Sequence, residues 1–390
     1  MVTKGVLNMS GNKKILVTFL IMLTIVSTLV SGCMESSSTS QSLPAQDESA
    51  TITITDMVGR TVVVPENVER VVAVGAGALR QIAYLDALDK VVGVESNEKD
   101  DTDTITAVYT LVNFDKMADL PEIGPSHGGD IELIAAAEPQ VIFFSRISGD
   151  VSDAEDYQTK TGIPVIYIDV GDMAGESRNT TYQCWQLCGK VLGKTERANE
   201  LQEYTEQLIA DLNARTENIP DEEKPLAYPC GLSYKASKGI LSTQYPFASL
   251  EFINVRHALD EDEIDDEEIP TYAFSVDQEN LFAWDPDVIF VDLSNLELVT
   301  DDVERSPSYK DLKAFNEDNV HGFLPVSAYH RNYGSVLVNS YYMGSVLYPD
   351  EFADVDVDEK ADEIYEMFLG EPAYDAVKDE LGGGARKLSF

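Results

Sequence analysis

The sequence predicts an α/β protein built from two similar lobes with mainly parallel sheets. Three observations indicate this. Strand and helix patterns alternate along most of the chain, one helix-to-strand unit occurs twice, and a long helical stretch separates the two copies. Alternation favours parallel sheets, because parallel strands need a crossover connection that is usually helical. The chain has 390 residues, 44% hydrophobic and 25% charged, which is typical of a globular protein with room for two domains.

Residues 1–33 have the pattern of a targeting segment. Two lysines precede an apolar run at 15–30, which is shorter than the roughly 20 residues that a membrane-spanning helix needs. Small residues and Cys33 follow, and this ending resembles a lipobox, in which the signal is cleaved before the cysteine and the thiol takes a lipid. An uncleaved anchor helix is the alternative, and both place the body outside the cytoplasm. Residues 34–50 are Ser-rich and predict a flexible tether.

The first predicted lobe spans residues 51–174. Alternating β-branched residues on both sides of 56–59 predict a hairpin. The patterns that follow predict strands at 71–74, 91–94 and 165–168 and a helix at 78–85. The glycines after the first of these strands do not form a dinucleotide-binding loop, because Arg80 stands where the third glycine of that fingerprint would fall.

A helical stretch at residues 175–219 separates the lobes. No proline occurs between Pro164 and Pro220, and Gly193 divides the stretch into two helices. The second helix has apolar residues three and four positions apart, and at 1.5 Å per residue it extends about 35 Å. A helix of that length can join two lobes, although ordinary core packing requires the same apolar stripe.

The second predicted lobe spans residues 220–372. Its patterns predict strands at 226–232 and 322–326 and helices at 334–347 and 358–369, and residues 373–390 are expected to form a tail. The acidic run at 260–268 is expected to be a solvated loop, because it lacks the Asp/Asn-Gly arrangement of a calcium loop.

Three cysteines remain in the body, at positions 184, 188 and 230. Three thiols cannot pair completely, and no further ligands stand at the spacing of a thiolate metal site. We therefore expect buried thiols.

The charge is strongly negative, with 28 Lys and Arg against 69 Asp and Glu, a formal net charge of −41. This balance excludes nucleic acid as a partner, because binding it needs basic groups that displace counterions. An acidic surface is typical of an adaptation for solubility, for example to a salty medium where screening weakens self-repulsion.

Two stretches of the chain read almost alike, DIELIAAAEPQVIFF (Asp130–Phe144) and DQENLFAWDPDVIFV (Asp277–Val291). Each contains an Asp, a Glu two positions later, a short helical run, an acid-proline pair and a Val-Ile-Phe strand. The Asp suits a helix N-cap, and the proline ends the helix before a buried parallel strand. The repeat therefore marks equivalent corners of two similar lobes.

Four stretches carry a family resemblance, TDMVGRTVVVPENVERVVAV, LPEIGPSHGGDIELIAAAEPQVIFFS, SVDQENLFAWDPDVIFV and VNSYYMGSVLYPDEF. In this order, behind a lipobox-like signal, they resemble the substrate-binding proteins of ABC importers for iron-chelate and cobalamin-type ligands. The resemblance covers roughly residues 51–370, with Gln140 where Asp is usual. It implies two Rossmann-like lobes joined by one long α-helix, a shallow cleft between them, a monomer, no cofactor and no enzymatic activity.

The resemblance also implies a role for Glu132 and Glu279. Matched to the family motif, each lies on the outer rim of one lobe and pairs with arginines of a dimeric ABC permease, which works with its ATPase. Two carboxylates at a fixed separation recognise a two-fold partner better than one does. The alternative is ordinary capping, because the helix dipole favours a carboxylate in the first turn by about 0.3–1 kcal/mol.

Polar residues follow several of the predicted strands, and ligands of open α/β sheets bind beyond the carboxyl ends of the strands. The ligand-binding candidates are His127, Arg146, Tyr234, Lys235, Tyr329, His330, Arg331 and Tyr333. Arg and Lys suit an anionic chelate, and Tyr offers a flat face to a large ring. Surface ion pairs are the alternative for the arginines, lobe packing for the tyrosines and hydrogen-bonded loop positions for the histidines.

These features predict an extracytoplasmic, lipid-anchored protein on the outer face of the cell membrane. It would capture a ferric siderophore, haem or corrinoid and deliver it to an ABC permease. A binder of bare transition-metal ions is one alternative, but it needs three or four converging ligands and the chain has four histidines in all. A surface enzyme is another, but the sequence has no nucleophile elbow, metalloprotease helix or P-loop. A receptor or adhesin without a permease is the third.

Overall fold

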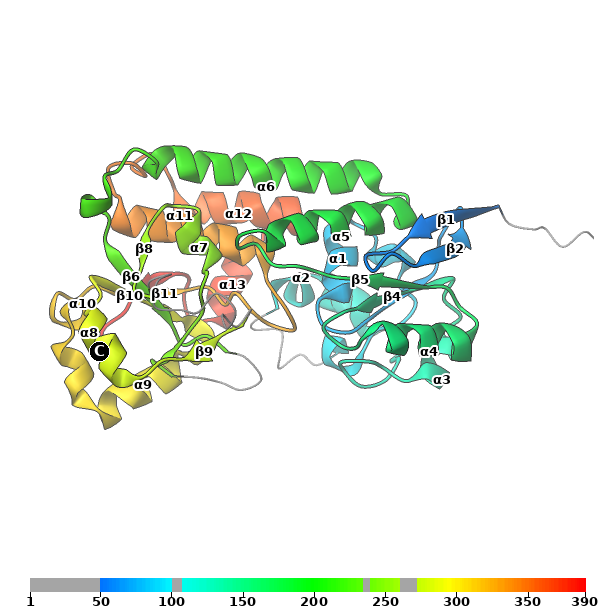
Figure 1. Cartoon of the computed structure of the whole chain (residues 1–390), viewed down its shortest axis with the longest axis horizontal. Coiled ribbons are helices and arrows are strands. Elements are labelled where there is room, and N and C mark those ends of the chain that lie inside the picture. Colours follow the sequence, from blue (N-terminus) through cyan, green and yellow to red (C-terminus); the bar gives the residue numbers. More distant parts are fainter. Residues whose placement is uncertain (1–49, 100–106, 234–238, 260–271) are drawn as a thin grey trace, which may run out of the picture. The chain divides into compact units, whose positions relative to one another are not determined.

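The computed structural model describes residues 50–99, 107–233, 239–259 and 272–390 (Figure 1). They belong to one compact unit, Ser49–Phe390. Cys33 with the predicted signal segment and tether, Tyr234, Lys235 and the acidic run at 260–268 lie outside the described residues. Within the described ranges, no helix is both long and apolar enough to cross a membrane.

The first lobe is built on a three-stranded parallel sheet in the order β3-β4-β5. Its strands are β3 (Val71–Val74), β4 (Val141–Ser145) and β5 (Val165–Ile168), and its helices are α1 (Ala78–Tyr84), α2 (Val108–Ala118), α3 (Ile131–Ala136) and α4 (Val151–Thr161). Every residue of the three strands is buried, as expected for a parallel sheet covered on both faces. The predicted hairpin is confirmed as β1 (Thr51–Thr55) paired with β2 (Thr61–Pro65).

The predicted strand at 91–94 is wrong as a continuous element. Val91 forms an isolated parallel bridge with Val71, and Val94 forms another with Glu122. Because the two valines pair with different neighbours, no ladder of consecutive pairs develops on either one.

The second lobe is built on a five-stranded sheet in the order β12-β11-β10-β6-β8. Its strands are β6 (Leu226–Cys230), β8 (Arg256–His257), β10 (Val288–Asp292), β11 (Val320–Phe323) and β12 (Arg386–Lys387), and the pair β7 (Ser242–Thr243) and β9 (Phe274–Ser275) lies apart. Its helices are α7 (Ala248–Glu251), α8 (Gln278–Trp284), α9 (Leu296–Arg305) and α10 (Lys313–Asn316). All pairings in the five-stranded sheet are parallel except that of β12.

The C-terminal segment differs from the expected tail at residues 373–390. It contains α13 (Tyr374–Glu380) and then β12, which pairs antiparallel with β11. The strand predicted at 322–326 is found as β11, which begins two residues earlier, at Val320, and ends at Phe323. The strand β12 therefore covers the outer side of β11 and forms the edge of the second sheet, and with two residues it is a very short edge strand.

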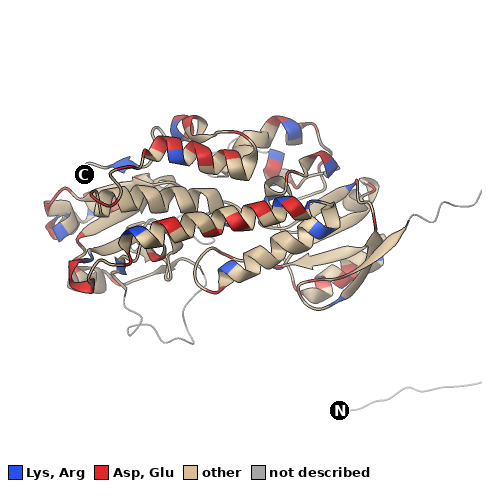
Figure 2. Ribbon diagram, turned by 90° about the horizontal axis from the view of Figure 1, so that it is seen from above, with Lys and Arg blue, Asp and Glu red and all other residues tan. Residues whose placement is uncertain are grey.

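The predicted helical connector consists of α5 (Ser177–Leu192) and α6 (Thr195–Thr216), and Gly193 ends α5 with a φ of 72°. Helix α6 packs on α5 and α11 (Tyr333–Leu347). The Tyr204 hydroxyl also donates to Glu363 of α12 (Val357–Leu369), over 2.9 Å. Figure 1 shows α6 running above α5, α11 and α12, and Figure 2 shows acidic residues recurring along its outer face. One long helix thus connects the two lobes.

An aromatic cluster joins α5 of this connector to helices of the two lobes. Tyr84 of α1, Trp185 of α5, Tyr333 of α11 and Phe368 of α12 contact one another with ring centroids 5.0 to 6.1 Å apart. Aromatic contacts of this kind add to the stabilisation that comes from area burial. The cluster therefore fixes helices of both lobes against each other.

The repeated unit adopts the same structure in both lobes, as α3 followed by β4 and as α8 followed by β10. The acidic residue before the proline is Glu138 in the first copy and Asp285 in the second. Both have a left-handed backbone conformation, with φ of 51° and 43° respectively. Asp130 accepts the backbone N–H groups of the first turn of α3, as predicted. Asp277 occupies the N-cap position of α8, but its side chain makes no capping hydrogen bond, which corrects that expectation.

Gln140 stands where Asp is usual, and its contacts show why an amide is tolerated at this position. Its side-chain oxygen accepts the N–H groups of Glu69 and Arg70, which lead into β3, over 2.7 and 3.1 Å. In the second lobe Asp287 accepts the N–H of Leu226, the first residue of β6, over 2.7 Å. Both side chains thus anchor the start of the neighbouring strand, and this requires an acceptor rather than a charge.

Candidate functional site

A cavity of about 580 Å³ opens where the loops that follow the strands of both sheets meet. Ala76 follows β3, Ser148 follows β4, Ser233 follows β6, and residues 327–331 follow β11. Among the described residues, the lining consists of Ala76, His127, Ile147, Ser148, Ser233, Tyr272, Ala273, Ser327, Ala328, Tyr329, His330 and Arg331. Ligand sites of α/β sheets occur at this end of the strands, so we call this cavity the cleft.

The loop at 327–331, the cleft loop, is held in a strained conformation. Tyr329 and His330 have φ of 44° and 85°, and His127 opposite them has φ of 65°. A left-handed backbone at a non-glycine residue costs about 1–3 kcal/mol and persists only where the surroundings enforce it. Three such residues line one cavity, and strain of this kind clusters at ligand sites.

Arg80 of α1 enforces the conformation of the cleft loop from the opposite lobe. Its wholly buried guanidinium donates to the backbone oxygens of Tyr329 and Arg331 over 3.3 and 2.9 Å, and also to that of Ala328. The guanidinium also lies 4.6 Å from the ring centre of Tyr109. A guanidinium has five donors in a fixed planar fork, so it can satisfy three carbonyls at once.

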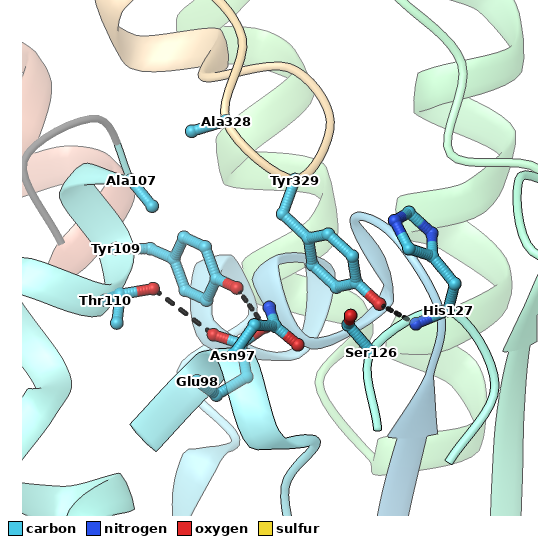
Figure 3. Close-up of a pocket in the computed structure, with 9 residues that line it drawn as sticks. All are labelled: Asn97, Glu98, Ala107, Tyr109, Thr110, Ser126, His127, Ala328 and Tyr329. Carbon is cyan, nitrogen blue, oxygen red and sulfur yellow. Dashed lines mark hydrogen bonds between the residues drawn. The ribbon is translucent and has the colours of Figure 1, made fainter. Parts of the chain in front are cut away.

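Tyr329 links the cleft loop to the first lobe (Figure 3). Its hydroxyl donates to the Glu95 carboxylate over 2.8 Å and accepts the backbone N–H of His127 over 2.6 Å. Its ring lies 4.8 Å from that of His127, centre to centre. Burial raises the pKa of Glu95, and the hydrogen bonds from Tyr329 and from backbone N–H groups, including those of Gly75 and Gly128, oppose the rise.

A second cavity of about 260 Å³, the side cavity, adjoins the cleft. The two cavities share His127, Ala328 and Tyr329, so the Tyr329 and His127 side chains belong to both walls. The described residues that line the side cavity are Asn97, Glu98, Ala107, Tyr109, Thr110, Ser126, His127, Ala328 and Tyr329.

Four of the predicted ligand-binding residues line the cleft, namely His127, Tyr329, His330 and Arg331. Arg331 is 5% exposed, and it donates to Asp172 over 2.8 Å and to Gln244 over 2.7 Å. Its charge is therefore largely neutralised by Asp172, in a buried ion pair rather than the surface pair of the alternative interpretation. What Arg331 offers to the cleft is mainly shape and the positive edge of a paired guanidinium.

His330 presents a neutral ring to the cleft. Burial first, and then the charges of Arg331 and Arg80, lower the pKa of His330 well below its usual range. Its Nδ1 atom is buried and has no hydrogen-bond partner among the described residues. The ring packs on Gly77, where an added Cβ would lie 2.9 Å from the Cβ of His330.

Two predicted residues are not at the cleft. Arg146 is exposed and pairs with Asp169 over 2.9 Å, which is the alternative foreseen for it. Tyr333 is wholly buried in the aromatic cluster, and its hydroxyl donates to the backbone oxygen of Val170, which corrects the expectation of a ligand contact. Sequence reasoning missed Arg80 and Glu95, because their contacts with the cleft loop span 234 to 251 positions and leave no local pattern. It also missed Glu98, because nothing in the local sequence indicates that this carboxylate is buried.

Glu132 lies in the first turn of α3 and Glu279 in that of α8, and both are exposed. In the part of the chain that the structure describes, neither carboxylate has a hydrogen bond or an ion pair. Each is therefore available to a partner.

Comparisons with known proteins identify the fold. A family model described as periplasmic binding protein matches residues 71–323. The sequence has no match among the curated proteins. Among solved structures, MolA, the molybdate periplasmic binding protein of a Haemophilus influenzae ABC transporter, is similar with a TM-score of 0.64 and 20% identity, over 82% of this chain and 98% of that chain.

Two further structures are similar over most of their length. The TroA-like periplasmic binding protein FepB from Veillonella parvula has a TM-score of 0.60 and 23% identity, over 82% of this chain and 97% of that one. Helicobacter pylori CeuE with Ni(II) bound has a TM-score of 0.58 and 14% identity, over 85% of this chain and 98% of that one. At these identities the likeness shows the fold.

Proposed function

Because the chain belongs to the periplasmic binding protein family, we propose that it captures a metal chelate in the cleft and delivers it to an ABC permease. The chelate would be a ferric siderophore, a haem or a corrinoid. The main support for this proposal is the cleft, which has a volume of about 580 Å³ and is lined by residues of both lobes. A volume of this size suits an organic ligand rather than a bare ion.

The lining of the cleft also favours a chelate. It combines apolar side chains such as Ile147 with a few polar groups, as small-molecule sites generally do. A bare transition metal needs three or four converging ligands, and within the described residues no group of three His, Cys, Asp or Glu side chains can hold a metal ion. His127 and His330 are the two histidines at the cleft.

The proposal is tested by thermal shifts of the body without its signal segment. The panel contains a ferric trihydroxamate, a ferric catecholate, haem and cobalamin, with free Zn²⁺, Mn²⁺, Ni²⁺ and molybdate as comparisons. A cleft ligand should raise the melting temperature by mass action on the folded state. Ser327→Trp, which fills the cleft, should abolish the shift, whereas Ser308→Trp at an exposed serine outside the lining should not. A response to the free ions alone would contradict chelate capture.

We further propose that Glu132 and Glu279 dock the protein on the permease, and that a lipid on Cys33 holds it at the membrane. Support comes from the equivalent places of the two glutamates in matching units and from their exposed, unpaired carboxylates. Two such contacts reinforce each other, because the second forms within a complex already made.

Replacing both glutamates with Ala should abolish uptake into cells while leaving affinity for the ligand within about twofold, because the carboxylates do not line the cleft. The double variant Glu155→Ala with Glu304→Ala removes the same charge from exposed helix positions of the two lobes. It should transport normally. Loss of uptake in both double variants would point to a general charge effect instead of docking.

A further inference from the structure

Two buried carboxylates at the lobe junction form no ion pair within the described residues. Glu95 and Glu98 are each 2% exposed, and in the described part of the chain neither forms an ion pair. The nearby cation, Arg80, directs both terminal nitrogens of its guanidinium to the backbone of the cleft loop. Buried charges are normally paired, because burying one alone is costly. Two carboxylates and one guanidinium leave one negative charge in excess when both acids are ionised.

The side cavity brings one of these carboxylates to its surface. Glu98 lines it and accepts hydrogen bonds from the hydroxyls of Tyr109 and of Thr110, the latter over 3.2 Å. Figure 3 shows Glu98 and Asn97 between the rings of Tyr109 and Tyr329. The Oδ1 atom of Asn97 is buried with no hydrogen-bond partner among the described residues. The cavity wall is therefore rich in oxygen acceptors, and the described residues that form it include no Lys or Arg.

We propose that the side cavity is a subsite for a protonated amine carried as an arm of the ligand in the cleft. An ammonium group offers three donors and no acceptor, which matches a wall of carboxylate, amide and hydroxyl oxygens. At about 260 Å³ the cavity is large enough for a short alkylammonium arm. The shared walls at Tyr329 and His127 place it beside the cleft. Its use in chelate capture rests on the proposed function.

The protonation of Glu98 makes this subsite dependent on pH. Burial raises the pKa of Glu98 to about 7, against the hydrogen bond from Tyr109 and the charge of Arg80. The charged or titratable groups that face it are Arg80 from α1, Tyr109 from α2, Glu95 from its own loop, Tyr329 from the cleft loop and His127 across the cavity. An ammonium favours the ionised carboxylate, so its binding should weaken below about pH 7.

The amine subsite is tested first without any chelate. Propylammonium chloride should raise the melting temperature at pH 8 more than sodium chloride at equal ionic strength, and more than the neutral propionamide. The excess should disappear at pH 6 and in Glu98→Gln. It should persist in Glu122→Gln, which removes an equal charge from an exposed position of the same lobe. No excess in the wild type, or an equal excess in Glu98→Gln, would overturn the subsite.

A matched pair of chelates then tests its use. A linear ferric trihydroxamate with a terminal ammonium should bind about tenfold more tightly, or better, than its N-acetyl derivative, since charge-assisted hydrogen bonds are roughly twice as strong as neutral ones. The preference should be lost in Glu98→Gln. Equal binding of both chelates would reject the subsite and leave chelate capture standing. Binding of propylammonium without either chelate would reject capture of these chelates and leave the subsite standing.

Discussion

At the scale of single residues, buried charge organises the cleft. Arg80 holds three backbone oxygens of a loop from the other lobe, and Glu95 accepts the hydroxyl of Tyr329 from that loop. Removing a buried donor leaves its acceptors unsatisfied at a cost of about 1–3 kcal/mol each. The geometry of the ligand-facing side chains thus depends on residues that do not line the cleft.

Glu98 should make stability depend on pH. Burial raises its pKa from 4.5 to about 7 in the folded protein. The folded state therefore holds the proton more tightly than the unfolded chain, and this contribution to stability is present below about pH 4.5 and lost as pH rises through about 7. Between pH 4.5 and 8 we expect wild type to lose roughly 2–3 kcal/mol of unfolding free energy relative to Glu98→Gln.

Urea unfolding of the two proteins at both pH values measures this difference. Glu122→Gln is the control, because its exposed carboxylate should give a pH-independent difference near zero. A gap between wild type and Glu98→Gln that stays constant from pH 4.5 to 8 would show that the pKa of Glu98 is the same in the folded and unfolded states.

At the scale of elements, the N-terminus of α1 supports the cleft loop. Gly77 has a φ of 78°, and an added Cβ there would lie 2.9 Å from the Cβ of His330. Only glycine combines this conformation with so close an approach. The start of a first-lobe helix is therefore packed directly against the ligand-facing loop of the second lobe.

Gly77→Ala should displace the cleft loop. Gly162→Ala is a matched control, because Gly162 has a φ of 72° and an added Cβ there meets nothing within 4 Å. The control should lose about 1–2 kcal/mol of unfolding free energy through backbone strain alone. Gly77→Ala should lose about 1–3 kcal/mol more through overpacking.

Gly77→Ala should also weaken binding of whichever panel ligand the wild type takes, measured by calorimetry. Equal losses in both variants would show that the contact with His330 is unimportant.

At the scale of the whole molecule, net charge should set the response to salt. The formal net charge is −41, and acids recur along the exposed face of α6 (Figure 2). Self-repulsion of this size opposes the compact state, and salt screens it, with a Debye length that falls from about 10 Å at 0.1 M to about 3 Å at 1 M.

The melting temperature should therefore rise by several degrees as NaCl increases from 0.1 to 1 M, as measured by differential scanning calorimetry. Choline chloride should act like NaCl, because screening does not depend on the identity of the cation. A rise with NaCl only would indicate specific sodium binding, and a fall would show that attractive surface pairs dominate.

The sequence by itself determined the architecture. Local periodicity located most strands and helices, and the repeat of Asp130–Phe144 in Asp277–Val291 identified two equivalent lobes. These features are local or recur at a fixed spacing, so one chain displays them without a partner structure. The same reasoning placed His127, Tyr329, His330 and Arg331 near strand ends, and the structure puts all four at the cleft.

Only the tertiary structure decided what those residues can do. It pairs Arg331 with Asp172, buries Tyr333 in the aromatic cluster, and brings Arg80, Glu95 and Glu98 to the lobe junction. Each of these outcomes depends on contacts between residues far apart in the chain and on the desolvation that such contacts produce. Distant contacts and desolvation have no signature in the local sequence, because burial and charge pairing exist only once the lobes have packed together.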